Sequence, residues 1–237
     1  MATKNLRSHF QAEVDIRLKE LQAQLDDAEK QALIEAALAN YSQDRPATRS
    51  ADVTGTAGFD YALNTTNFPS FEDGFSVFEL IEYPYDSTDA DPNALEDDDW
   101  TIYQAGTTKY LRFVTAKPAA TETIRAHYTY PYVFDASGNV DVPLSDFRAI
   151  CDLAAAKNLR ALASKMTSTG DSTFQADAIS YRSKAREALD LAKAYEAAYT
   201  DHMGLGDGKA SGATVVSDWD TEYSFQSDFL THPKRWR

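Results

Sequence analysis

Residues 174–199 read FQADAISYRSKAREALDLAKAYEAAY and contain the strongest helical pattern of the chain. Small and aromatic side chains recur there at alternating spacings of four and three: Phe174, Ala178, Tyr181, Ala185, Ala188, Ala192, Tyr195 and Tyr199. This spacing places all of them on one face of an α-helix. Half of these positions are alanine, so the element that packs against this stripe must come close.

A second helical pattern, residues 145–166, lies directly upstream. The connector between the two is STGDST, in which Gly170 is expected to end one helix and Asp171 or Ser172 to cap the next. We therefore predict an αα-hairpin. The stripe is expected to lie inside this hairpin, because a partner helix is so near in sequence, and a seam between subunits is the alternative.

The composition of the 237 residues excludes several classes of protein. Hydrophobic residues make up 43% of the chain, enough to build a core. The single cysteine, Cys151, excludes an intrachain disulfide, and we expect it to be a small buried side chain. No apolar run approaches membrane-spanning length, and the start MATKNLRSHF has no hydrophobic core of a signal peptide. We therefore expect the protein to be made and used in a reducing, soluble compartment.

The net charge of −14 is unevenly distributed. Residues 50–140 hold four basic and fifteen acidic side chains, a net charge of −11, whereas residues 141–200 hold eight of each. Such an acidic surface repels phosphate, which argues against a protein that reads or wraps nucleic acid.

The N-terminal region is predicted to contain two helices. Apolar residues recur at helical spacing over residues 3–25. Asp26 and Glu29 then form a capping-box pattern that starts a second helix, from Ala28 to about Tyr41, and Pro46 prevents its continuation.

From about Ser50 the pattern changes to that of strands. We predict strands at 77–83, 100–103, 109–115 and 124–130, with an earlier one within 53–63, and a hairpin turn at Gly106. Five or so short strands would form a small antiparallel sandwich or barrel, with an acidic loop at 86–99.

No motif in the chain indicates catalysis or metal binding. Asp89, Asp91 and Asn93 have the first spacings of a calcium loop, but Ala94 and Trp100 occupy the positions that need glycine and glutamate. The histidines show no spacing that suggests a metal pair or a relay with Cys151: His9, His127, His202 and His232. The glycines of 204–208 lack a preceding strand and are expected to form a linker. We therefore expect no enzyme activity and no cofactor. Pairs of carboxylates that could act in acid–base catalysis are common in so acidic a chain, but nothing in the sequence selects one pair.

The order of short motifs resembles a known family. Residues 37–46 read ALANYSQDRP, 77–84 VFELIEYP, 97–103 DDDWTIY, 152–156 DLAAA, and 170–177 GDSTFQAD with YRSKAR at 181–186. In this order they resemble head–tail connector (adaptor) proteins of long-tailed bacteriophages that carry a β domain inserted in a helical fold. The resemblance covers roughly residues 28–200, and none of its motifs has catalytic content.

The resemblance and the sequence patterns together predict an α+β protein with an α-helical adaptor body and an inserted antiparallel β domain. The extended C-terminal arm is predicted from composition alone, because it lies beyond the residues that the resemblance covers. The expected divisions are N-terminal helices at 1–49, the β insert at 50–140, a helical hairpin at 141–203, and a linker with the arm at 204–237. The implied function is that of a virion neck protein, assembled in host cytoplasm. It would form a ring, about twelve-fold, under the portal, dock the next neck or tail-completion protein, and let DNA pass without sequence-specific binding.

The C-terminal segment is the predicted portal-binding arm. It follows a glycine-rich linker and combines interface-type anchors with basic residues: Trp219, Tyr223, Phe225, Phe229, Leu230, Pro233, Lys234, Arg235, Trp236 and Arg237. Packing of this arm against its own subunit is the alternative.

Two other functions fit the same sequence. One is a tail-completion or other neck ring protein that does not bind a portal. The other is a ligand-binding β module, for glycan or metal, carried on a helical stalk.

Overall fold

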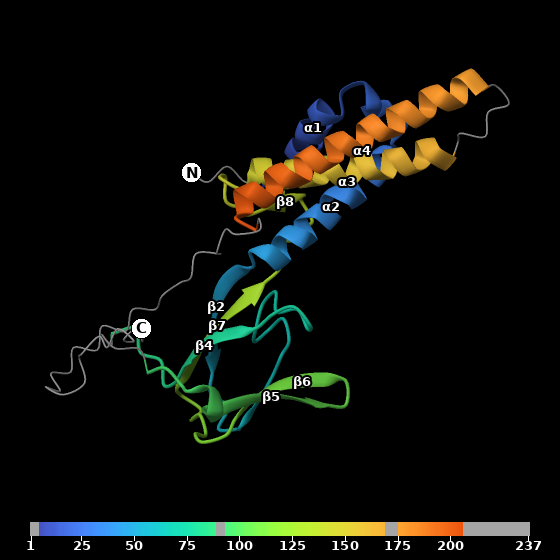
Figure 1. The fold of residues 1–237 in the computed structure, drawn as a ribbon. Helices are drawn as coiled ribbons and strands as arrows, with labels where there is room; N and C mark the ends of the chain where they lie inside the picture. Colours follow the sequence, from blue (N-terminus) through green and yellow to red (C-terminus); the bar gives the residue numbers. More distant parts are fainter. Residues whose placement is uncertain (1–4, 89–92, 169–174, 206–237) are drawn as a thin grey trace, which may run out of the picture.

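The computed structural model describes residues 5–88, 93–168 and 175–205 of the chain. Over these ranges the protein is α+β, as predicted: four α-helices form one body, and two three-stranded antiparallel sheets form a second. The two bodies lie end to end, with the helices at one end and the sheets at the other (Figure 1). None of the described helices is both long and apolar enough to cross a bilayer.

The helical body consists of α1 (Arg7–Leu18), α2 (Asp27–Asp44), α3 (Phe147–Ser168) and α4 (Gln175–Met203). Helix α3 lies between the others and contributes the largest share of its buried side chains: Ala149, Ile150, Cys151, Leu153, Ala154, Ala156, Leu159, Leu162, Ala163 and Met166. Cys151 is fully buried, as expected, and burial raises the pKa of its thiol to about 12.

The predicted hairpin of α3 and α4 is confirmed. Ala185, Ala188, Ala192 and Tyr199 of the stripe are all buried in the same core as α3. Gly170, the expected caps and Phe174 lie outside the described residues. Ala178 and Tyr181 belong to α4, but their side chains are outside the described part of the structure. Since the described part of the stripe faces a helix of its own chain, it is the inside of a hairpin and not an intersubunit seam.

The N-terminal prediction was right for α2 and wrong in part for the first helix. Asp26 accepts a hydrogen bond from the backbone N–H of Glu29 (2.7 Å), whose side chain accepts one from Asp26 N, so the capping box is present. The helix expected over 3–25 instead ends at Leu18 and is followed by a 3₁₀ turn, η1 (Lys19–Gln24). The break occurs at Lys19, whose φ of 52° is incompatible with a continuing right-handed helix, and it lets the chain reverse direction towards α2.

The first two residues described also differ from the prediction. Asn5–Leu6 form β1, which pairs with β8 (Asn139–Val140) and so ties the N-terminus to the segment that leads into α3.

The β module contains two sheets. The first has the order β2-β7-β4, from Ala47–Thr54, Thr123–Tyr130 and Phe78–Glu82. The second has the order β3-β6-β5, from Asp60–Ala62, Thr108–Phe113 and Trp100–Ala105. The hairpin of β5 and β6 turns at Gly106, whose φ of 63° suits glycine, as predicted.

The strand expected within 53–63 is present as the short strand β3, but the sequence analysis missed the longer strand β2 that precedes it. The structure has a full strand at Ala47–Thr54, paired along its length with β7, and a short one at Asp60–Ala62. Strand β2 was hard to detect because two of its inward residues are Ala47 and Ala51, which give little apolar contrast along the sequence.

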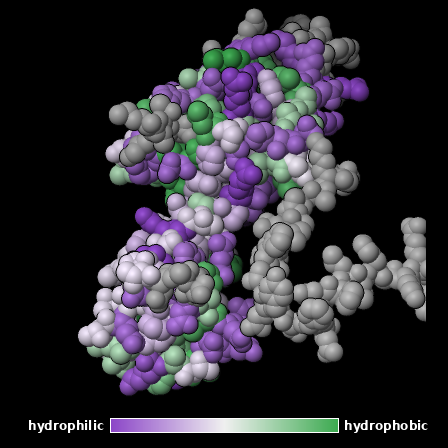
Figure 2. Space-filling view, turned by 90° about the vertical axis from the view of Figure 1, so that its left-hand side faces the viewer, coloured by the Kyte–Doolittle hydropathy of each residue, from purple (hydrophilic) through white to green (hydrophobic). Residues whose placement is uncertain are grey.

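The two bodies have separate cores. The inner faces of the two sheets meet around aromatic side chains: Tyr61, Phe68, Phe78, Phe113 and Tyr128. None of the buried residues of this cluster belongs to the helical cluster. In Figure 2 the two lobes are joined through a narrower middle, and apolar patches are scattered between larger hydrophilic areas on both lobes.

The close packing of α3 and α4 yields a stability prediction. Replacing Ala192, which is fully buried, with leucine should cost about 1–3 kcal/mol of unfolding free energy, because the seam has no room for the added atoms. The matched control is Ala194→Leu two residues on, an exposed position, which should change stability by less than about 0.5 kcal/mol. Urea unfolding followed by circular dichroism measures both, and equal midpoints would show that the seam is loose.

Candidate functional site

The two bodies meet at a waist, which we define as the last turn of α2, the segment 131–146 and the end of α4. The chain crosses the waist twice, once outward from α2 through Arg45 and Pro46 into β2, and once back from β7 into α3. The position of the β module relative to the helices therefore depends on the contacts made at these crossings.

A buried carboxylate, Asp146, holds the waist together. Its Oδ2 accepts hydrogen bonds from Tyr41 Oη (2.6 Å) and Arg45 Nη1 (2.6 Å), both in or beside the last turn of α2. Its Oδ1 contacts Nε2 of His202 in α4 (3.1 Å) and accepts a hydrogen bond from Ser145 Oγ (2.9 Å). One side chain at the start of α3 therefore joins three helices.

These contacts determine the ionisation of Asp146. Burial by itself would raise the pKa of this carboxyl, because it disfavours the charged form. Hydrogen bonds from Tyr41, Arg45, His202 and Ser145 outweigh the burial and hold the pKa well below its usual range. The pKa of Tyr41 is raised by burial and by its bond to Asp146, so this hydroxyl stays a donor.

A second layer of contacts surrounds Asp146. The backbone N–H of Tyr132 donates to Ser42 Oγ (2.9 Å), and the rings of Tyr132 and Tyr41 lie 5.3 Å apart. In α4, Tyr199 donates its hydroxyl hydrogen bond to Asp44 near the end of α2. The returning segment and α4 are thus both fixed to the same turn of α2.

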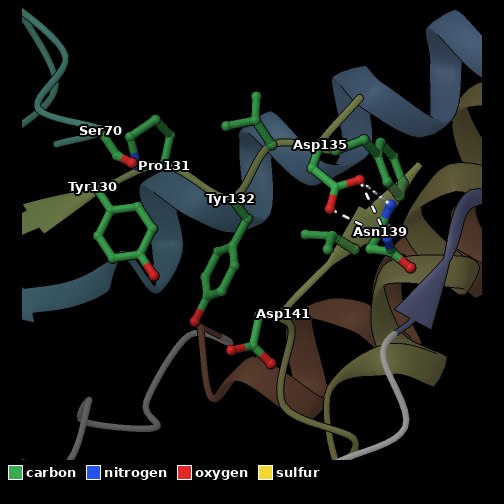
Figure 3. Close-up of a pocket in the computed structure, with 10 residues that line it drawn as sticks. Ser70, Tyr130, Pro131, Tyr132, Asp135, Asn139 and Asp141 are labelled. Atoms are coloured by element: carbon green, nitrogen blue, oxygen red, sulfur yellow. Dashed lines mark hydrogen bonds between the residues drawn. The ribbon is translucent and has the colours of Figure 1, made fainter. Parts of the chain in front are cut away.

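The segment 130–141 borders a hollow of about 520 Å³, which we call the waist groove. The following residues line it: Ser70, Tyr130, Pro131, Tyr132, Val133, Phe134, Asp135, Asn139, Val140 and Asp141. The ring centroids of Tyr130 and Tyr132 are 6.5 Å apart, and in Figure 3 the Tyr132 hydroxyl points towards Asp141. The lining therefore combines aromatic rings with two carboxylates and contains no basic residue.

The outer face of the sheet β2-β7-β4 carries a second polar group that the sequence did not reveal. Ser50 Oγ lies 3.0 Å from His127 Nδ1, and His127 Nε2 lies 2.9 Å from Glu82 Oε1. A serine, a histidine and a carboxylate in this order have the connectivity of a catalytic triad. The sequence analysis considered His127 only for a metal pair or a relay with Cys151, and it did not find these contacts because each partner comes from a different strand.

Catalysis by such a group would have further requirements. Acyl transfer needs backbone donors aimed at a developing oxyanion and a cavity for the substrate. Ser50 and His127 are directly opposite each other in the β2–β7 ladder and lie on the solvent side of the sheet. Neither lines the waist groove. We interpret the group as cross-strand polar pairing, of the kind made by Arg125 and Asp52 on the same face.

The other candidates from the sequence gain no support as binding sites. Among the described residues, no group of three or more His, Cys, Asp or Glu side chains could hold a metal ion. Most of the calcium-like spacing at 89–93 lies outside the described residues. The acidic run 97–99 forms a 3₁₀ turn, η2, that leads into β5, as expected.

All ten residues predicted to bind the portal lie outside the described part of the chain, as does the segment 206–237 that contains them. That assignment stays a prediction. The residues that do form the waist were not singled out by sequence, because Asp146 meets its partners more than fifty residues away in each case except Ser145.

Comparison with known proteins gives weak structural likenesses, of which two are described here. No family model and no curated protein matches the chain. A chain of a structure described as "Neck of empty GTA particle computed with C6 symmetry" matches with a TM-score of 0.28 and 14% identity, over 65% of this chain and 78% of that one. A chain of "Neck of native GTA particle computed with C12 symmetry" matches with a TM-score of 0.28 and 12% identity, over 73% and 89%. Both neighbours are thus from particle necks, but a TM-score this low does not establish a shared fold.

The Asp146 cluster yields a prediction about pH. Because the pKa of Asp146 is lower in the folded than in the unfolded protein, its contribution to stability is complete above the unfolded value of about 3.9 and is lost as the pH falls through the folded value. Asp146→Asn should therefore cost about 2–3 kcal/mol at pH 7, and the difference from the parent protein should shrink below about pH 4.

The matched control for this prediction is Asp98→Asn, which neutralises an exposed carboxylate of η2. It should change stability by less than about 0.5 kcal/mol at either pH. Urea midpoints at pH 7 and pH 3 compare the three proteins. A pH-independent loss in Asp146→Asn would mean that shape, not charge, holds the waist.

Proposed function

We propose that this chain is a structural protein of a phage-like particle neck, a head–tail connector that forms a ring beneath the portal and docks the next neck or tail protein. The order of the sequence motifs that resemble the connector family supports this proposal. The observation that carries it is the inserted β module: a sheet pair with its own core leaves a helical body after α2 and returns before α3.

A ring subunit needs two different contact faces, one for each neighbour, and further surface for the partners above and below. Large apolar side chains are exposed on both bodies. Ile16, Leu189 and Leu191 lie on the helices, and Val77, Ile102 and Val114 lie on the β module. Single exposed apolar residues are ordinary, but their presence on two separately folded bodies suits a subunit with several partners.

The distribution of charge fits a channel for DNA. Most of the acidity belongs to residues 50–140, while the hairpin region 141–200 is neutral overall. A negative lumen repels phosphate, so it would let DNA move without retaining it. A catalytic role is not part of the proposal, since Ser50, His127 and Glu82 do not line the waist groove.

The first test is assembly with the portal. Purified protein mixed with portal rings of its own particle should form a stacked complex, seen in negative-stain images as an added ring on one face of the portal. Binding to tail ends but not to portals would support the tail-completion alternative. Failure to form rings with either partner would overturn the proposal.

The second test is binding to duplex DNA. We expect no retention of a 30-base-pair duplex at about 150 mM salt, because a net charge of −14 per subunit offers few phosphate contacts. Fluorescence anisotropy measures this directly, with a basic DNA-binding protein as the positive control. Submicromolar binding that weakens steeply with salt would contradict an acidic channel.

A further inference from the structure

The waist groove has the chemistry of a receptor for a basic, aromatic peptide. Tyr130, Pro131 and Tyr132 present flat apolar surfaces, and Asp135 and Asp141 supply negative charge. The protein already places cations on aromatic rings of this segment: the guanidinium of Arg49 lies 5.8 Å from the Tyr130 ring centre and that of Arg7 lies 4.9 Å from that of Phe134.

The volume of the groove is suited to such a ligand. At about 520 Å³ it lies in the range of roughly 300–1,000 Å³ typical of ligand pockets. The carboxylate of Asp135 accepts hydrogen bonds from Ser137 N and Asn139 N, which fix the wall of the groove. Asp141 is exposed and lies in a loop between β8 and α3.

The chain leaves the described structure beside this groove. Helix α4 ends at Met203 and is followed by Gly204, whose φ is 71°. Gly204 N donates to Asp201 O and Leu205 N to Thr200 O, a Schellman pattern that fixes the direction in which the chain leaves the helix. The last turn is held at the waist, because His202 contacts Asp146, five residues after Asp141 in sequence. The 32 residues that follow Leu205 therefore start close to the groove.

The end of that segment has the complementary chemistry. Residues 232–237 read HPKRWR and combine three cations with an indole ring. Between Leu205 and His232 lie 26 residues, and an extended chain spans about 3.3 Å per residue, so the reach is ample. The cost of closing a loop of this length grows only slowly with length.

We propose that the waist groove binds the segment 232–237 of its own chain, with Trp236 against Tyr130 and Tyr132 and the basic side chains facing Asp135 and Asp141. The groove is thus a holding site for the arm. The inference does not depend on the neck function. If the arm also binds the portal, as the sequence predicts, the portal must displace it from the groove, and the groove would keep the arm covered until then.

A disulfide-exchange experiment on the full chain tests the proposal. Val133→Cys places a thiol in the groove lining at an exposed position, and Thr231→Cys places one next to the basic segment. Cys151 can stay, because it is buried and its thiol has a pKa of about 12. Equilibration in glutathione buffers gives the effective concentration of the two thiols.

The control pair replaces Val133→Cys with Ile102→Cys, an exposed position of β5 in the other sheet. We expect the groove pair to have an effective concentration at least about tenfold higher than the control pair. Asp141→Lys should lower the value of the groove pair to near that of the control. Adding Lys234→Asp and Arg235→Asp to Asp141→Lys should restore it.

Each contrary result overturns the proposal. An effective concentration within about twofold of the control pair, or one that Asp141→Lys leaves unchanged, would show that the groove does not hold the arm. Disulfide-linked dimers on a non-reducing gel would show that a second copy supplies it. Thermal unfolding of each variant confirms that Asp141→Lys is folded, and Asp141→Asn, which should lower the value partially, provides a milder second variant.

Discussion

The structure depends on a charge kept ionised inside the protein. An isolated carboxylate at the depth of Asp146 would be too costly to bury, so it is stable only while Tyr41, Arg45 and His202 all reach it. Those residues belong to the ends of α2 and α4. The requirement to satisfy one carboxylate therefore fixes where three helices meet, and with them the two chain crossings from which the β module extends.

The outer face of the sheet β2-β7-β4 is rich in polar side chains. Along β7, Ile124, Ala126 and Tyr128 face the core while Arg125 and His127 face solvent. Both outward residues are engaged across strands, with Asp52 in one case and Ser50 and Glu82 in the other. These pairs satisfy the polar groups of the outer face, while the apolar side chains of the inner face pack in the core of the β module itself.

The sequence predicted what depends on local pattern. The stripe at 185–199, the capping box at Asp26 and the turn at Gly106 each follow from spacing within a few residues. The sequence analysis failed where the structure is determined by residues far apart in the chain or by small side chains. Helix α1 ends at Leu18, because the chain turns at Lys19 towards α2. Strand β2 was not detected, because its inward residues include alanines. The waist could not be predicted, because Asp146 and Tyr41 are 105 residues apart and neither stands in a motif.

The separation of cores makes the waist the natural place for a partner to act. A ligand on the outer face of the β module contacts one body only. The segment 130–141, in contrast, forms one wall of the waist groove and also bonds through Tyr132 to Ser42 in α2. Anything that binds against Tyr130 and Tyr132 therefore touches the return crossing itself.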